Sequence, residues 1–203
     1  PAPSGTVIQS YTDSHTRNYY QKYHASLNPT GYKNETQSTQ REHTLLKNAI
    51  EAVRGQVPAN LNLDGDNDGK VDNVCFVIQG SPMGWNDLLW PHMWSLHSYD
   101  VSINNKLVST YNFQLETATD EEGVGVLAHE MFHSLGAPDL YHYKYNKDIA
   151  PAWKWDLMEY NLNPPQHMGA YMKMQYGKWF NSITAITASG TYTLNPLTSS
   201  TNN

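Results

Sequence analysis

The stretch AHEMFHSLGAPDLY, residues 128–141, contains the side chains whose types and spacing could do chemistry. Residues four apart lie on one face of an α-helix, so His129 and His133 can present imidazole nitrogens to a single point. Neutral imidazole is a good zinc ligand. Glu130 would flank such a metal, where a general base is needed. Asp139 is the expected third ligand, which leaves a fourth position open as in catalytic zinc sites.

A helix must carry the two histidines, and the sequence indicates where it begins and ends. Apolar residues recur at helical spacing over residues 124–135. Before them, Thr119 and Glu122 have the spacing of a capping box. Gly136 can adopt the left-handed conformation that ends a helix. The chain can then turn back, so that Asp139 reaches the metal.

Two other residues compete with Asp139 for the third ligand position. Glu159 lies at a separation suited to the gluzincins, in which a glutamate on a later helix binds zinc. His142 lies close to Asp139 in the sequence. The helix stop at Gly136 and the methionine turn around Met158 favour Asp139 over Glu159. The remaining alternative is a helix with two ordinary histidines and no metal.

A methionine in an irregular region supports the metal-binding interpretation. Met158 lies in WDLMEY, about twenty residues after the helix. This arrangement resembles the metzincin peptidases, which carry a methionine turn beneath the zinc-binding histidines. In astacin-like and serralysin-like members a tyrosine two residues later touches the metal or stabilises the oxyanion. Tyr160 has this spacing, and the alternative for it is an ordinary packing tyrosine.

Several segments together resemble the immune-inhibitor-A family of secreted bacterial metallopeptidases. They occur in the family's order over about residues 64–179: DGDNDGKVDNVCFVIQG, WPHMWSL, GVLAHEMFHSLGAPDLY, WDLM and GAYMKMQYGKW. The resemblance implies a zinc endopeptidase with a metzincin-like catalytic domain. It also implies that His129, His133 and Asp139 bind zinc and that Glu130 is catalytic. Family members often have small residues after the methionine, where this chain has Glu159 and Tyr160.

An aspartate-rich segment before residue 74 has the pattern of an EF-hand-like calcium loop. Carboxylates, a carbonyl oxygen and a glycine that allows a tight turn are what such a loop requires. Position 12, normally glutamate, is Cys75, so the loop needs an oxygen from another segment. The alternative is an Asx-rich turn before a strand. Calcium is favoured because close carboxylates repel one another without a cation. The expected ligands are Asp64, Asp66, Asp68, Lys70 through its carbonyl, and Asp72.

The remaining patterns predict an α/β fold with a mixed twisted sheet. We expect a backing helix over residues 39–54, a strand in VCFVIQG with Cys75 in the core, and an aromatic loop around WPHMWSL. His92 and His97 in that loop are expected to be structural. Residues 101–117 predict a hairpin about Asn104 and Asn105, GAYMKMQYGKW a second helix, and residues 183–197 a closing hairpin. An N-terminal lobe (1–136) and a smaller irregular lobe (137–203) would form one peptidase domain.

Composition narrows the function further. A net charge of −6 without a basic run argues against nucleic acid as a partner, and no apolar stretch is long enough to span a bilayer. Together with the zinc motif and the family resemblance, this leads us to expect a monomeric zinc endopeptidase acting on proteins or peptides, as a domain that can belong to a longer multidomain chain. The family resemblance implies a secreted or cell-surface location. The alternative is a catalytically silent, zinc-containing surface binding module of the same fold.

Overall fold

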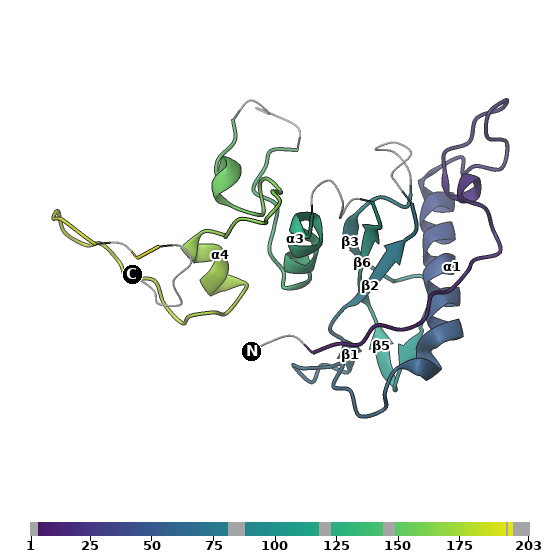
Figure 1. The fold of residues 1–203 in the computed structure, drawn as a ribbon, viewed down its shortest axis with the longest axis horizontal. Coiled ribbons are helices and arrows are strands. Elements are labelled where there is room, and N and C mark those ends of the chain that lie inside the picture. The colour runs from purple at the N-terminus through teal and green to yellow at the C-terminus, as the bar shows by residue number, and fades with distance from the viewer. Residues whose placement is uncertain (1–3, 81–87, 118–122, 144–148, 194, 197–203) are drawn as a thin grey trace. The chain divides into compact units, whose positions relative to one another are not determined.

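The computed structural model describes residues 4–80, 88–117, 123–143, 149–193 and 195–196 (Figure 1). They form a mixed α/β protein with three α-helices and two small mixed sheets. The chain divides into two compact units, residues 1–117 and 118–203. The lobes expected from the sequence have a different boundary, at residue 136, and that division stays a prediction. Among the described residues, no helix has the length and apolarity needed to cross a membrane.

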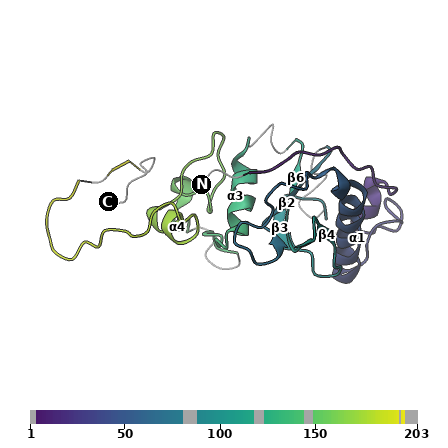
Figure 2. The same cartoon turned by 90° about the horizontal axis from the view of Figure 1, so that it is seen from below.

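The first unit contains the expected backing helix, α1 (Glu35–Val53). It begins before residue 39 because Asn34 caps it, accepting a hydrogen bond from the backbone N–H of Gln37 at 2.9 Å. One face of α1 is buried, with Leu46 and Ile50 almost completely enclosed. Figures 1 and 2 show that α1 lies along one face of the sheet that contains β2, β3 and β6.

That sheet has the order β2-β6-β3, with β2 (Val74–Ile78) parallel and β3 (His92–Ser95) antiparallel to the central strand. The central strand, β6 (Thr110–Leu115), buries Tyr111 and Phe113 completely in the core that α1 covers. The expected strand in VCFVIQG is therefore confirmed as β2.

The second sheet has the order β1-β5-β4 and includes the expected hairpin. Strands β4 (Ser102–Ile103) and β5 (Lys106–Val108) are antiparallel, whereas β1 (Lys70–Val71) is parallel to β5. Asn104 and Asn105 have φ angles of 49° and 64°. Two consecutive left-handed residues characterise the tight turns that join antiparallel strands, and asparagine tolerates this conformation. The hairpin expected about these two residues is confirmed.

The described residues also form short 3₁₀ segments. In the first unit they are η1 (Arg17–Tyr20) and η2 (Arg54–Gln56). The second unit contains α3 (Gly125–Ser134), η3 (Trp153–Trp155) and α4 (Ala170–Gln175). Its core gathers methionines and other apolar residues from α3, α4 and the segments between them: Phe132, Ala137, Leu157, Met158, Met168 and Met172. The two helices expected here are thus present, although α4 is short. The expected capping box, Thr119 and Glu122, lies outside the described residues.

Three expectations about the fold were wrong. The segment WPHMWSL is not only a loop, because His92–Ser95 forms β3 against β6. The described residues 183–193, 195 and 196 form no strand, so the closing hairpin is absent over that part of the chain. Cys75 is exposed rather than in the core. Strand β2 lies at a sheet edge, and its alternation turns Cys75 and Val77 (66% exposed) away from the core.

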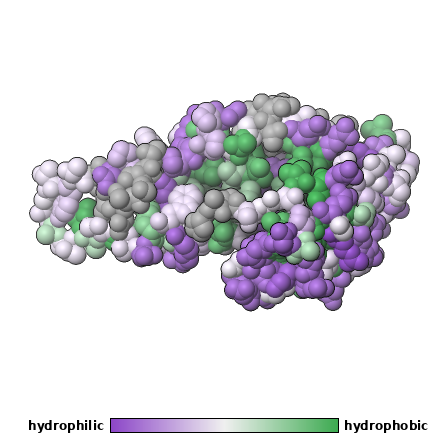
Figure 3. Space-filling model, turned by 60° about the horizontal axis from the view of Figure 1, so that its bottom comes forward, coloured by the Kyte–Doolittle hydropathy of each residue, from purple (hydrophilic) through white to green (hydrophobic). Residues whose placement is uncertain are grey.

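On the face drawn in Figure 3, the first unit shows hydrophilic residues together with hydrophobic patches, and its exposed apolar side chains include Val7, Leu27 and Val77. In the second unit, several large aromatic side chains are exposed, among them Trp155 at 76% and Tyr143 at 65%.

Candidate metal centre

The helix that carries both histidines, α3, ends as the sequence predicts. Gly136 has a φ of +90°. Its N–H donates to the carbonyl of His133 at 2.8 Å, and the N–H of Ala137 donates to the carbonyl of Phe132 at 3.3 Å. These two bonds form a Schellman motif, which reverses the chain directly after the helix. Because Phe132 and Ala137 also share the core of the second unit, the reversal is anchored by packing.

The reversal brings Asp139 to the two histidines. The Nε2 atoms of His129 and His133 lie 3.1 Å apart, and Asp139 Oδ1 lies 2.9 Å and 3.2 Å from them, respectively. Ligand atoms on a tetrahedral zinc at the usual bond lengths lie about 3.3 Å apart. Asp139 Oδ1 is buried, and among the described residues it makes no hydrogen bond. Three atoms that converge in this way, one of them a buried oxygen without a hydrogen bond, fit a divalent cation.

The other imidazole nitrogens are already engaged. His129 Nδ1 lies 2.9 Å from the carbonyl oxygen of Leu157, and His133 Nδ1 lies 2.7 Å from that of Ala137. A carbonyl oxygen only accepts, so each Nδ1 carries the proton and donates it. The two Nε2 atoms therefore have their lone pairs available in the neutral rings. This is the tautomer in which histidine binds zinc through Nε2, with a backbone partner fixing the ring.

The charges at this cluster are strongly coupled. Burial alone would raise the pKa of Asp139, but the interactions with His129 and His133 in their protonated forms, and with the Tyr143 hydroxyl, hold it well below its usual range. Burial opposes a charge on His133, yet the interaction with Asp139 and the Ala137 carbonyl raises its pKa above the usual value. Asp139 is thus an anion at neutral pH, as a metal ligand must be.

Glu130 also lies on α3, next to the first histidine, and is 9% exposed. It is not one of the three residues whose ligand atoms converge. Glu130 thus lies outside the converging set, and its role as a general base stays a prediction.

The segment 156–160 forms a turn that supports the cluster. Met158 is completely buried, and its carbonyl accepts from the N–H of Leu140 at 2.8 Å, one residue after Asp139. The preceding residue, Leu157, supplies the carbonyl that accepts from His129. One turn therefore holds both the first histidine and the segment of the third ligand.

Asp156 organises this turn, and the sequence reasoning gave it no role. Its side chain, 4% exposed in the residue as a whole, accepts from the N–H of Met158 at 2.9 Å and of Gly169 at 2.7 Å. Its backbone carbonyl accepts from the N–H of Glu159 and Tyr160. A buried carboxylate that joins a turn to the segment before α4 fixes the path of both. The only feature of the sequence that could have pointed to this role of Asp156 is its place in the WDLM segment.

Two tyrosines after Asp139 were also missed. The Tyr143 hydroxyl donates a hydrogen bond to Asp139 Oδ2. Burial and the Asp139 carboxylate raise the pKa of Tyr143 to about 12, so the hydroxyl keeps its proton. The ring of Tyr141 is nearly parallel to that of His129, with centroids 6.5 Å apart. Their positions two and four residues after the aspartate were the available signal.

The other expected residues lie as follows. Tyr160 stacks on Trp153, with ring centroids 5.7 Å apart, and its catalytic role stays a prediction. The Glu159 carboxylate accepts from the N–H of Ala152 at 2.9 Å. Neither Glu159 nor His142, the two rivals for the third ligand position, belongs to the group of converging ligand atoms.

In the first unit, His92 Nε2 lies 3.0 Å from a Glu42 carboxylate oxygen.

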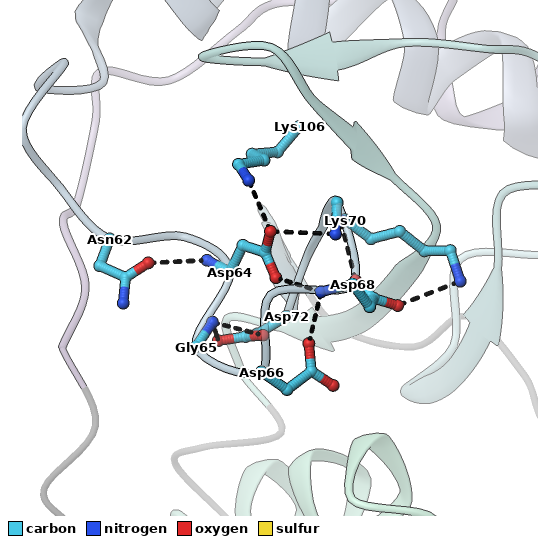
Figure 4. Close-up of polar contacts among 9 residues, drawn as sticks. Asn62, Asp64, Gly65, Asp66, Asp68, Lys70, Asp72 and Lys106 are labelled. Carbon is cyan, nitrogen blue, oxygen red and sulfur yellow. Dashed lines mark hydrogen bonds and ion pairs between the residues drawn. The ribbon is translucent and has the colours of Figure 1, made fainter.

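The expected calcium loop brings three carboxylates together, from Asp64, Asp66 and Asp72. Figure 4 shows that a lysine from another segment enters this loop: Lys106 Nζ lies 2.6 Å from Asp64 Oδ2. The hydrogen bond from this ammonium group is the main reason why the pKa of Asp64 lies below its ordinary value. The Lys106 ammonium group is thus a cation of the chain itself, and it is paired with Asp64, the only buried aspartate among the described residues of the loop.

Backbone N–H groups satisfy much of the remaining acceptor capacity in the loop. Asp64 accepts from Asp68 and Gly69 at 2.9 Å and 3.0 Å, and Asp72 accepts from Gly65 at 3.1 Å. Asp68 is paired with Lys70 Nζ at 3.1 Å. The repulsion that favoured calcium in the sequence argument is therefore reduced by two lysines and by these N–H groups.

No family model matches the chain, and a search of curated proteins found no match. The functional interpretation therefore depends on the chemistry of the residues described above.

Proposed function

We propose that the chain is a zinc-dependent endopeptidase with a metzincin-like arrangement, of the kind that the immune-inhibitor-A resemblance implies. The observation that carries the proposal is the convergence of His129 Nε2, His133 Nε2 and Asp139 Oδ1 within 3.2 Å of one another. Two imidazoles and one carboxylate form a three-residue set that leaves a fourth position open for chemistry. The secreted or cell-surface location is part of the same proposal.

In the proposed mechanism, each residue of the site has a separate role. When bound, zinc supplies Lewis acidity, which lowers the pKa of a water molecule towards about 7 and polarises a peptide carbonyl. Glu130 accepts the proton of the attacking water and delivers it to the leaving amine. His129 and His133 stay neutral, held as Nδ1–H tautomers by the Leu157 and Ala137 carbonyls. An additional oxyanion donor, assigned to Tyr160 by the sequence, stays a prediction.

The decisive experiment replaces Glu130 with glutamine. The variant should bind one zinc per chain with the affinity of the parent, because the carboxylate is not among the converging ligands. Cleavage of casein should fall about a hundred- to ten-thousand-fold, the usual contribution of a general acid–base group. Zinc content is measured by elemental analysis and cleavage with a labelled casein, with chelator-treated parent as the blank.

Two control variants test the ligand set. Asp139→Ala should bind zinc far more weakly than the parent, because only the two histidines remain as ligands, whereas Glu159→Ala should bind zinc as the parent does. The reverse result would transfer the third ligand position to Glu159 and refute the arrangement. A zinc-loaded parent that cleaves nothing would instead support the non-catalytic surface binding module. Cleavage by Glu130→Gln at the parent rate would exclude Glu130 as the base.

A further inference from the structure

The two oxygens of the Asp139 carboxylate have different surroundings. Oδ1 faces the two histidine Nε2 atoms, and among the described residues it makes no hydrogen bond. Oδ2 accepts the hydroxyl proton of Tyr143. A carboxylate can bind a metal through one oxygen or through both, and it can rotate between these modes. Occupation of one oxygen by a donor therefore selects the other for the metal.

We propose that Tyr143 is a positioning residue for the third ligand: its hydroxyl holds Asp139 Oδ2, so that Oδ1 alone is presented to zinc. This inference rests on the proposed function. A phenol suits the task because it donates a hydrogen bond without a positive charge. A lysine or arginine at the same place would neutralise the carboxylate and compete with the metal. Donors of this kind around metal ligands typically change metal affinity by about 10- to 100-fold.

The ring of Tyr141 packs against that of Tyr143. The rings of Tyr141 and Tyr143 meet edge to face, with centroids 5.1 Å apart and planes inclined by 66°. Tyr141 in turn lies parallel to the His129 ring, with an interplanar angle of 16°. Residues 139, 141 and 143 thus turn their side chains to one side of the segment that follows the helix. The contacts connect the third ligand to the first histidine through aromatic rings.

Packing does not account for the position of Tyr143. The residue is 65% exposed, so its burial stabilises the fold little. Tyr160, the tyrosine that the sequence assigned to the site, stacks on Trp153 instead, and Lys154 Nζ lies 5.6 Å from its ring centroid. Two phenols, those of Tyr141 and Tyr143, interact with the Asp139 carboxylate, and the Tyr143 hydroxyl is the one that donates directly to Oδ2.

The test measures zinc affinity with a competing chromophoric chelator on the full chain. Tyr143→Phe removes only the hydroxyl and should weaken zinc binding about 10- to 100-fold. The matched control is Tyr171→Phe, a tyrosine on α4 that is 58% exposed; it should bind zinc as the parent does. Thermal unfolding of the metal-free proteins should differ little among all three, which separates positioning from a loss of fold.

A double-mutant cycle with Asp139→Ala tests whether Tyr143→Phe changes zinc affinity through the Asp139 carboxylate. Without the carboxylate, the additional change Tyr143→Phe should no longer alter zinc affinity, because its partner is gone. An equal loss in both backgrounds would overturn the proposal, as would parent-like affinity of Tyr143→Phe. If the parent itself binds no zinc, the proposed function fails. If the parent binds zinc and Tyr143→Phe binds it equally well, only the positioning role fails.

Discussion

Replacing Asp156 with alanine removes the two hydrogen bonds that tie the Met158 turn to the segment before α4. The carboxylate accepts from the N–H of Met158 at 2.9 Å and of Gly169 at 2.7 Å, and the residue is 4% exposed. A hydrogen bond to a charged group contributes about 1.5–3 kcal/mol, so the loss of both costs about 3–6 kcal/mol. Asp156→Asn keeps one carbonyl oxygen as an acceptor and should cost about half of that.

The same change should weaken zinc binding, because the turn supplies the carbonyl that accepts from His129 Nδ1. Loss of such a partner lowers metal affinity by about 10- to 100-fold. Urea unfolding of the metal-free full chain measures the first effect, and chelator competition measures the second. Asp100→Ala, at an exposed aspartate, is the control for charge removal alone. If Asp156→Ala unfolds like this control and binds zinc like the parent, Asp156 does not organise the turn.

Two further predictions concern the first unit. His43 is completely enclosed, and burial, opposed by Glu42 and aided by His97, lowers its pKa below the ordinary value of 6.5. The unfolded chain then binds more protons, so stability should fall as pH drops through about 6.5. His43→Gln should flatten the dependence of the free energy of unfolding on pH between 7.5 and 5.5; an unchanged slope would contradict this. Lys106→Met removes the ammonium group 2.6 Å from Asp64 Oδ2. The variant should melt at a lower temperature than the parent, and millimolar calcium should raise its Tm by more than it raises that of the parent. Equal calcium responses would show that Lys106 does not stand in for a cation.

Much of the fold could be predicted because its signals are local. Helical spacing located α1, turn residues bounded β2, and paired asparagines marked the hairpin. Strand β3 was missed because its identity depends on pairing with β6, not on any pattern of its own. The exposure of Cys75 was missed for a related reason: an apolar run does not reveal whether its strand lies at the edge or at the centre of a sheet.

In the candidate site, too, the residues with local sequence signals could be predicted, whereas those that depend on distant contacts could not. The two histidines, the helix stop at Gly136 and Asp139 follow from spacing along one helix and its reversal. The residues that support these ligands, Asp156 and Tyr143, do not follow from such spacing. Asp156 accepts from Gly169, which is 13 residues away, and a sequence pattern does not encode that partnership. Tyr143 was hidden among 14 tyrosines, since only a contact distinguishes a donor to a ligand from a surface ring.

The lysine in the acidic loop also determines what a chelation experiment can report. An ammonium group on the chain's own β5 strand cannot be stripped by EDTA, whereas a dissociable ion can. Removal of divalent metal should therefore leave the Asp64 segment anchored to Lys106. Under the proposed function, loss of proteolysis on chelation would accordingly report on the histidine cluster of the second unit, without collapse of the loop as a second cause. An investigator could thus attribute inactivation by EDTA, and its reversal by added zinc, to a single location.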